Sequence, residues 1–110
     1  MDNEEAAREE TLQARVIAEL HYIFDPEIPV NIYDLGLIYG VEVDETTGRV
    51  DVRMTLTAPA CPVAGSLPEI VADAVRTVEG VSDVGVELVW DPPWTVEMMS
   101  EAARLQLGML

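Results

Sequence analysis

The segment 49–57 constrains the fold more than any other part of the sequence, because polar and apolar residues alternate along it without a break. Successive side chains of a strand point to opposite faces, so this pattern predicts a strand with one apolar face and one wet face. A sheet containing it must be covered on one side only. The apolar phase is Val50, Val52, Met54 and Leu56, and the polar phase is Arg49, Asp51, Arg53, Thr55 and Thr57.

The residues before this strand predict a helix, a loop and a partner strand. Apolar residues recur every three or four positions over 12–24, which is typical of an amphipathic helix that stops before Asp25. Residues 25–34 hold two prolines among polar residues and predict an ordered loop. Alternation over 37–44 predicts a strand, and the turn residues 45–48 predict a hairpin.

The residues after this strand predict a helix, a strand and a final helix. Apolar spacing indicates a helix from Pro62 to a glycine cap at Gly80, with Ile70 in its apolar stripe. Alternation returns over 84–90, and a last helix is expected between Thr95 and Gly108. The order α-β-β-α-β-α predicts an α/β (α+β) two-layer sandwich, a small three-stranded sheet covered by helices. The strand order is left open.

Composition restricts the class of protein. A chain of 110 residues fits a single domain, 1–110, whose acidic residues 1–10 are expected to form a solvated, frayed start. The formal charge of −15 argues against nucleic acid and anionic membranes as partners. One cysteine cannot form an intrachain disulfide, and no apolar run is long enough to span a membrane, so the expected location is cytoplasmic.

That cysteine, Cys61, stands where the strand pattern gives way to the helix pattern. Pro62 is a favourable first helical residue, which places Cys61 at the N-cap. Free N–H groups and the positive end of the helix dipole there favour the thiolate, so we expect a depressed pKa for the thiol. The alternative is a small buried hydrophobe with no chemical role.

Other chemistry lacks the necessary residues. A Cys/His dyad would need the single histidine, His21, to reach Cys61, and nothing in the sequence indicates that it does. A structural zinc site needs four ligands, while the chain has one cysteine and one histidine. No glycine-rich nucleotide loop follows a strand. We therefore predict that the protein is not an enzyme.

Two polar loops are candidates to flank Cys61. Their carboxylates could ligate iron beside the thiolate, orient a partner, or cap turns. Trp90 continues the inward phase of its strand and is expected in the core, whereas Trp94 lies past Pro92 and Pro93 and is expected to be an exposed anchor. The first loop carries Asp25, Glu27, Asn31 and Asp34, and the second carries Asp91, Trp94 and Thr95.

Four motifs in register point to a known family. They are Asp25-Pro26-Glu27-Ile28-Pro29-Val30-Asn31-Ile32, Asp34-Leu35-Gly36-Leu37-Ile38, Thr55-Leu56-Thr57 leading to Cys61-Pro62, and Val89-Trp90-Asp91-Pro92-Pro93-Trp94-Thr95. Over residues 12–108 the chain resembles the SufT-like proteins of the MIP18/PaaD-like group, which assist iron–sulfur cluster assembly or insertion. The resemblance implies that Asp25, Pro26, Glu27 and Cys61 are functional positions, supported by Asn31, Asp34, Thr57, Pro62, Asp91 and Trp94.

The sequence departs from the family pattern in two places. Many relatives have Thr-Pro-Gly before the cysteine, whereas this chain has Ala58-Pro59-Ala60, so a close backbone approach that depends on glycine is not retained. The PaaD-like relatives of the phenylacetate pathway carry an additional cysteine-rich segment, and this sequence has no second cysteine. The resemblance therefore favours a SufT-like protein over a PaaD-like one.

The resemblance implies an accessory factor for iron–sulfur proteins whose partners are the assembly machinery and client apoproteins. One thiolate cannot complete the four-ligand shell of a cluster, so we expect no tightly bound cofactor. Iron or a cluster would be held transiently at Cys61 and shared with a partner. A thiol-dependent enzyme and a binding module with an inert cysteine remain the alternatives, and the formation of a homodimer is left open.

Overall fold

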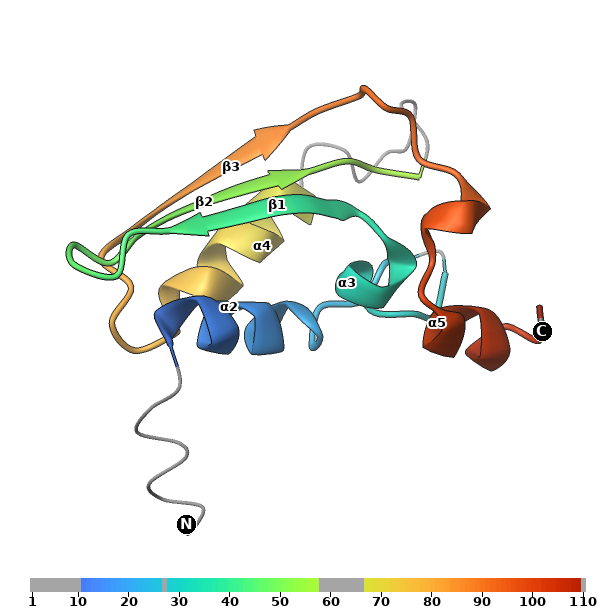
Figure 1. Ribbon diagram of the computed structural model, residues 1–110, viewed down its shortest axis with the longest axis horizontal. Helices are drawn as coiled ribbons and strands as arrows, with labels where there is room; N and C mark the ends of the chain where they lie inside the picture. The colour runs from blue at the N-terminus through green and yellow to red at the C-terminus, as the bar shows by residue number, and fades with distance from the viewer. Residues whose placement is uncertain (1–10, 27, 58–66, 110) are drawn as a thin grey trace, which may run out of the picture.

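A three-stranded sheet forms one layer of the molecule. The computed structural model describes residues 11–26, 28–57 and 67–109. Strands β1 (Ile38–Val43), β2 (Arg49–Met54) and β3 (Asp83–Leu88) lie in the order β1-β2-β3 (Figure 1). β1 pairs with β2 antiparallel and β3 pairs with β2 parallel, which places the most strongly alternating strand at the centre. The predicted acidic start, residues 1–10, lies outside the described residues.

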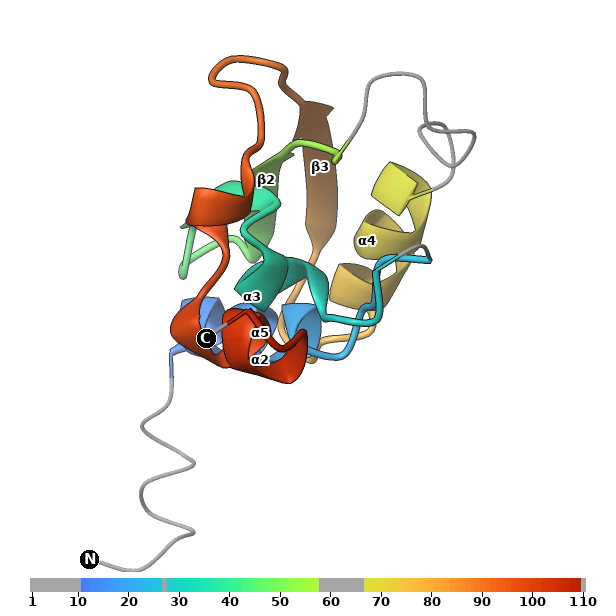
Figure 2. The same cartoon turned by 90° about the vertical axis from the view of Figure 1, so that its right-hand side faces the viewer.

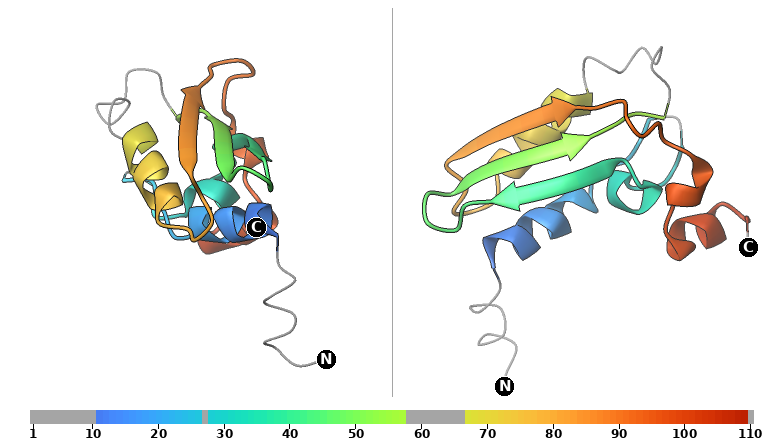
Figure 3. Two further views of the ribbon diagram at one scale, coloured as in Figure 1. Left: turned by 90° about the vertical axis from the view of Figure 1, so that its left-hand side faces the viewer. Right: turned by 45° about the horizontal axis from the view of Figure 1, so that its top comes forward.

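Two helices form the second layer. Helix α2 (Leu12–Leu20) contacts β1, helix α4 (Leu67–Arg76) contacts β3, and the two helices contact each other. Figure 3 shows both on one face of the sheet, and no described helix covers the other face. The predicted two-layer α+β sandwich is therefore confirmed. Within the described part of the chain, no helix is long and apolar enough to cross a membrane.

The core lies between these layers, where the apolar phase of β2 meets the apolar stripes of the helices. The polar phase of β2 faces away, as the alternation predicted, except that Thr55 is fully buried. Burial of the apolar phase fixes the register of β2, because a slip of one residue would expose all of these apolar side chains. The buried side chains of β2, α2 and α4 are Val50, Val52, Met54, Leu12, Val16, Leu20, Leu67, Val71, Ala72 and Val75.

Three predicted helix boundaries or faces were wrong. Helix α2 ends at Leu20, and Phe24 is 56% exposed in an isolated antiparallel bridge with Asn31. Ile70 is 51% exposed, so the apolar stripe of α4 is narrower than the spacing indicated. α4 ends at Arg76, which leaves Gly80, with φ of +100°, in the following turn rather than at the helix cap.

The segment 25–34, predicted to be a loop, leads into a short helix, α3 (Ile32–Leu35). Asn31 caps it: its side-chain oxygen accepts a hydrogen bond from the Asp34 amide at 2.9 Å. An asparagine three residues before an acidic residue is a known helix-start signal, and it was overlooked in the sequence. The helix ends at Gly36, whose φ of +89° is the left-handed cap conformation.

The predicted last helix is divided in two. The 3₁₀ helix η2 (Val96–Met98) follows Thr95, whose side chain makes no cap hydrogen bond. Helix α5 (Glu101–Gln106) starts after Ser100, whose hydroxyl accepts from the Ala103 amide at 3.1 Å. Ser100 is therefore the N-cap that the sequence interpretation assigned to Thr95. Gly108 follows α5 with φ of +73°, as expected for a helix end.

Candidate functional site

The predicted site residues fall at one end of the molecule. Because β2 and β3 are parallel, the chain segments that leave their carboxyl ends start side by side. Figure 1 shows the loop 25–31 at that same end, and Figure 2 looks onto it. In Figure 2 this loop and the segment 89–95 lie on different sides of the end of β2. Glu27, Cys61 and Pro62 are outside the described residues, so the structure does not test the predictions made for them.

The chain that leads toward Cys61 is held on both sides beyond the end of β2. The Thr55 amide donates to the Leu37 carbonyl at 2.8 Å, and the Val89 amide donates to the Met54 carbonyl at 2.8 Å. Thr55 is fully buried and Leu56 is 4% exposed. The last described residue of this segment, Thr57, therefore continues from a fixed backbone, four positions before Cys61 in the sequence.

Asp25 is a buried carboxylate, with an exposure of 7%. Its Oδ2 accepts a hydrogen bond from the Ile28 amide at 2.8 Å, and its own amide donates to the Val30 carbonyl at 3.3 Å. The adjacent Pro26 is exposed. The carboxylate thus accepts from the backbone of its own loop, as aspartates in turns often do.

Asn31 and Asp34 bind each other. Besides accepting from the Asp34 amide, the Asn31 side chain donates to the Asp34 carboxylate at 2.9 Å. The Asp34 carbonyl accepts from the Ser100 amide at 2.8 Å, which joins α3 to the start of α5. Both side chains thus organise the helix that borders the loop. Within the described residues, no three His, Cys, Asp or Glu side chains are close enough together to hold a metal ion.

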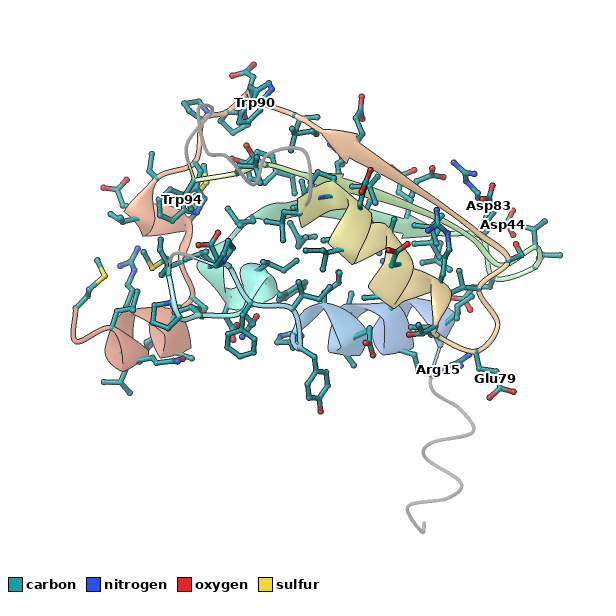
Figure 4. The ribbon with its side chains drawn as sticks, turned by 180° about the vertical axis from the view of Figure 1, so that it is seen from behind. Arg15, Asp44, Glu79, Asp83, Trp90 and Trp94 are labelled. Atoms are coloured by element: carbon teal, nitrogen blue, oxygen red, sulfur yellow. The ribbon has the colours of Figure 1, made fainter. Side chains whose placement is uncertain are left out.

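The two tryptophans exchange the roles that the sequence predicted for them. Trp90 is 43% exposed, whereas Trp94 packs against the core and its Nε1–H donates to the Leu35 carbonyl at 2.8 Å. β3 ends at Leu88, so the alternation cannot be extended to Trp90. Figure 4 shows both tryptophans at the end of the molecule opposite Asp44 and Asp83. Of the two tryptophans, Trp90 is therefore the exposed one at the candidate site.

Asp91 lines a groove that the sequence interpretation did not identify. Across it, Tyr39 donates from its hydroxyl to the Pro92 carbonyl at 2.7 Å, with Met98 Sδ at 3.4 Å as a second acceptor. Burial raises the pKa of Tyr39; the Thr55 hydroxyl lowers it and the Asp91 charge raises it. The phenol therefore stays protonated at neutral pH. The overlooked signal was Gly40, since a glycine within a strand often marks a bulge, and a bulge occurs here.

His21 is engaged within its own part of the fold. Its Nδ1 lies 2.8 Å from the Ile17 carbonyl, and its ring lies against Tyr33 with 4.5 Å between centroids. The Nδ1 is therefore a donor to the carbonyl at the end of α2. No contact of His21 in the described part of the chain supports a dyad with a thiol.

Comparisons with known proteins agree on one family. A family model described as "Iron-sulfur cluster assembly protein" matches residues 13–88. The chain is 48% identical over 110 residues to an Fe-S protein maturation auxiliary factor of Porphyromonas gingivalis, covering 100% of both. It is 39% identical over 87 residues to the auxiliary factor SufT of Staphylococcus aureus, covering 79% of this chain and 98% of that protein. A solved domain of unknown function from Bacillus anthracis, DUF59, is similar with a TM-score of 0.84 and 37% identity, covering 96% and 99% of the two chains.

Proposed function

The chain belongs to the family of iron–sulfur cluster assembly proteins, and from this premise we propose how it acts as an accessory factor in the maturation of client proteins. The Cys61 thiolate binds iron or a cluster transiently and passes it to a client. In this proposal the loop of Asp25 and Glu27 adjusts the affinity of the site for the cargo. The protein is an auxiliary factor and catalyses no reaction of its own.

The observation that carries the proposal is the fixed backbone before Cys61. Hydrogen bonds to Leu37 and from Val89 hold both sides of the chain as far as Thr55. The buried Asp25 loop lies at the same end. The described chain is thus fixed as far as Thr55, six positions before Cys61 in the sequence, and this anchoring supports a site at this end of the molecule.

The charge of the chain favours a cationic cargo. With 21 acidic and 6 basic residues, the protein attracts iron ions over the distances at which net charge steers association. Carboxylate and thiolate groups are both iron ligands, and the resemblance assigns functional positions of both kinds to this end of the molecule. Binding of iron at this end is thus consistent with the negative electrostatic field of the protein.

A single thiolate leaves the ligand shell of a bound cluster incomplete. A cluster requires four protein or small-molecule ligands, and this chain contributes one sulfur. The remaining ligands come from the assembly machinery, a client apoprotein or a small thiol. The site therefore releases its cargo readily, which suits transfer better than storage. Action in the cytoplasm is part of the proposal, since a lone thiol persists best in a reducing compartment.

The proposal is tested by anaerobic transfer with purified protein. Wild type is loaded with iron and sulfide, mixed with an apo-client, and the cluster content of the client is followed by absorbance and by its activity. Cys61→Ser should lose most of the stimulation. The matched control is the double variant Cys61→Ser, Ala18→Cys, which carries its one thiol at an exposed position of α2. This double variant should not regain the activity that Cys61→Ser loses. Full transfer by Cys61→Ser would overturn the proposal.

A further inference from the structure

A groove of about 590 Å³ opens beside the candidate site, on the side of the segment that follows β3. It combines a cation, an anion, two phenol rings and apolar side chains within one concave surface. Such a combination is typical of small-molecule sites, in which a few polar groups fix the orientation of a ligand against apolar walls. The lining residues are Tyr33, Gly36, Ile38, Tyr39, Arg53, Asp91, Pro92 and Met98.

Arg53 provides the cation. It lies on the open face of β2 across from Gly40, and a Cβ at Gly40 would collide with its guanidinium, so the glycine makes room for the arginine to lie against β1. No described acidic group lies within ion-pair distance of Arg53. By contrast, Arg49 on the same face pairs with Asp51 and Asp83. Its cross-strand neighbour Glu87 forms no ion pair with it, so the guanidinium is available to a ligand.

Asp91 provides the anion. It is exposed and lines the groove together with Tyr39, and its charge raises the pKa of that phenol. It lines the same groove as Arg53 and forms no ion pair with it. The hydrogen bond from Tyr39 to the Pro92 carbonyl holds the wall that carries Asp91.

The floor of the groove is built by a close backbone approach. A Cβ at Gly36 would collide with the Met98 carbonyl, so the end of α3 and the helix η2 can meet only because residue 36 is glycine. This contact places the Met98 side chain beside Ile38 and the Tyr33 ring in the lining. Apolar and aromatic side chains of a ligand would find matching surface there.

We propose that this groove binds a short zwitterionic peptide, with its carboxylate at Arg53, its ammonium group at Asp91 and apolar side chains against Ile38 and Met98. A simple anion would be repelled by the net charge of the protein. A zwitterion carries no net charge, and each of its ends meets the opposite charge. A dipeptide or tripeptide has both the two charges and the apolar side chains that this lining would contact. The proposal does not depend on the Cys61 chemistry.

Nuclear magnetic resonance of the full-length protein tests the proposal. L-leucyl-L-leucine is titrated into ¹⁵N-labelled protein, and the shifts of the Gly36 and Gly40 amides report on the groove. We expect saturable shifts at these amides and at neighbouring lining residues. The N-acetylated and the C-amidated dipeptides should each bind about tenfold more weakly, since each lacks one charge and the charge-assisted hydrogen bond that it makes.

Variants of Arg53 and Asp91 test which end of the peptide each residue binds. Arg53→Gln should abolish the difference between the free and the amidated dipeptide, and Asp91→Asn the difference between the free and the acetylated one. Arg49→Gln, on the same face but outside the groove, should leave binding unchanged. The proposal would be overturned if the free dipeptide caused no shifts in the groove, or if the capped dipeptides bound as tightly as the free one. Groove shifts caused only by an intact client protein would also overturn it and make the groove a protein-docking surface. These readouts do not involve client maturation, so they fail independently of the proposed function.

Discussion

The carboxylate of Glu45 caps helix α2 through the Leu12 amide, which donates to Glu45 Oε1 at 3.0 Å. The next amide, of Gln13, donates to Oε2 at 3.2 Å. Glu45 belongs to the hairpin turn between β1 and β2, so a turn residue satisfies two of the free N–H groups at the start of a helix more than 30 positions away in the sequence. This contact joins the two layers at the end of the molecule opposite the candidate site.

Glu45→Ala should lower the free energy of unfolding by about 1 kcal/mol, because the helix loses a charged cap at its positive end. Urea unfolding followed by circular dichroism measures the change. Glu42→Ala is the control, since Glu42 is an exposed acidic residue of the same hairpin, and it should cost less. Equal losses in the two variants would show that the cap adds nothing beyond a general effect of the substitution.

Trp94→Phe should also destabilise the protein by about 1 kcal/mol, because the Leu35 carbonyl loses its donor in a partly buried site. Trp90→Phe should be close to neutral, since that ring is 43% exposed. The two single-tryptophan proteins also allow a direct check, because acrylamide should quench the fluorescence of Trp90 more strongly than that of Trp94. The opposite order of quenching would contradict the structure.

Gly36→Ala should be more harmful than Gly108→Ala. Both residues have positive φ, so each alanine meets a backbone penalty of about 1 kcal/mol. Only at residue 36 would the new Cβ also collide with the Met98 carbonyl, while residue 108 has nothing within 4 Å. The difference in thermal stability between the two variants thus isolates the contact that forms the groove floor. A difference of zero would exclude that contact.

Asp44 should make stability depend on pH at the acid end. Backbone hydrogen bonds from Thr47 and Thr46 lower the pKa of Asp44 below its usual 3.8. A carboxyl group with a lowered folded pKa stabilises the protein above its unfolded value, and this contribution is lost as pH falls through the folded value. The stability difference between wild type and Asp44→Asn should therefore be constant above about pH 5 and shrink below about pH 4. A difference that grows on acidification would contradict this assignment.

Sequence patterns predicted the sheet better than its surroundings. β2 was predictable because Val50, Val52 and Met54 must all face one layer, and this requirement leaves a single register. The bulge at Tyr39 was not, because it depends on contacts between β1 and residues more than 50 positions later. The same holds for Glu45, whose role as a cap requires the hairpin and α2 to be packed together.

The candidate site was predictable in its location and less so in its details. The resemblance correctly indicated the family, and the parallel strands bring the motifs to one end. The prediction had Trp90 buried and Trp94 exposed, and the structure shows the reverse. The alternation ends at Leu88, and the contact of Trp94 with Leu35 decides which ring is buried. Arg53 was predicted only as part of a wet face, since the groove beside it forms from α3, β1 and η2 together.

The central claim is maturation through Cys61, and complementation in the host tests it most directly. The gene is deleted and restored as wild type or as Cys61→Ser, and the activities of several iron–sulfur enzymes are compared with those of metal-free enzymes from the same cells. The account predicts a selective loss of the iron–sulfur activities that wild type restores and Cys61→Ser does not. Equal rescue by both forms, at equal protein levels, would contradict it.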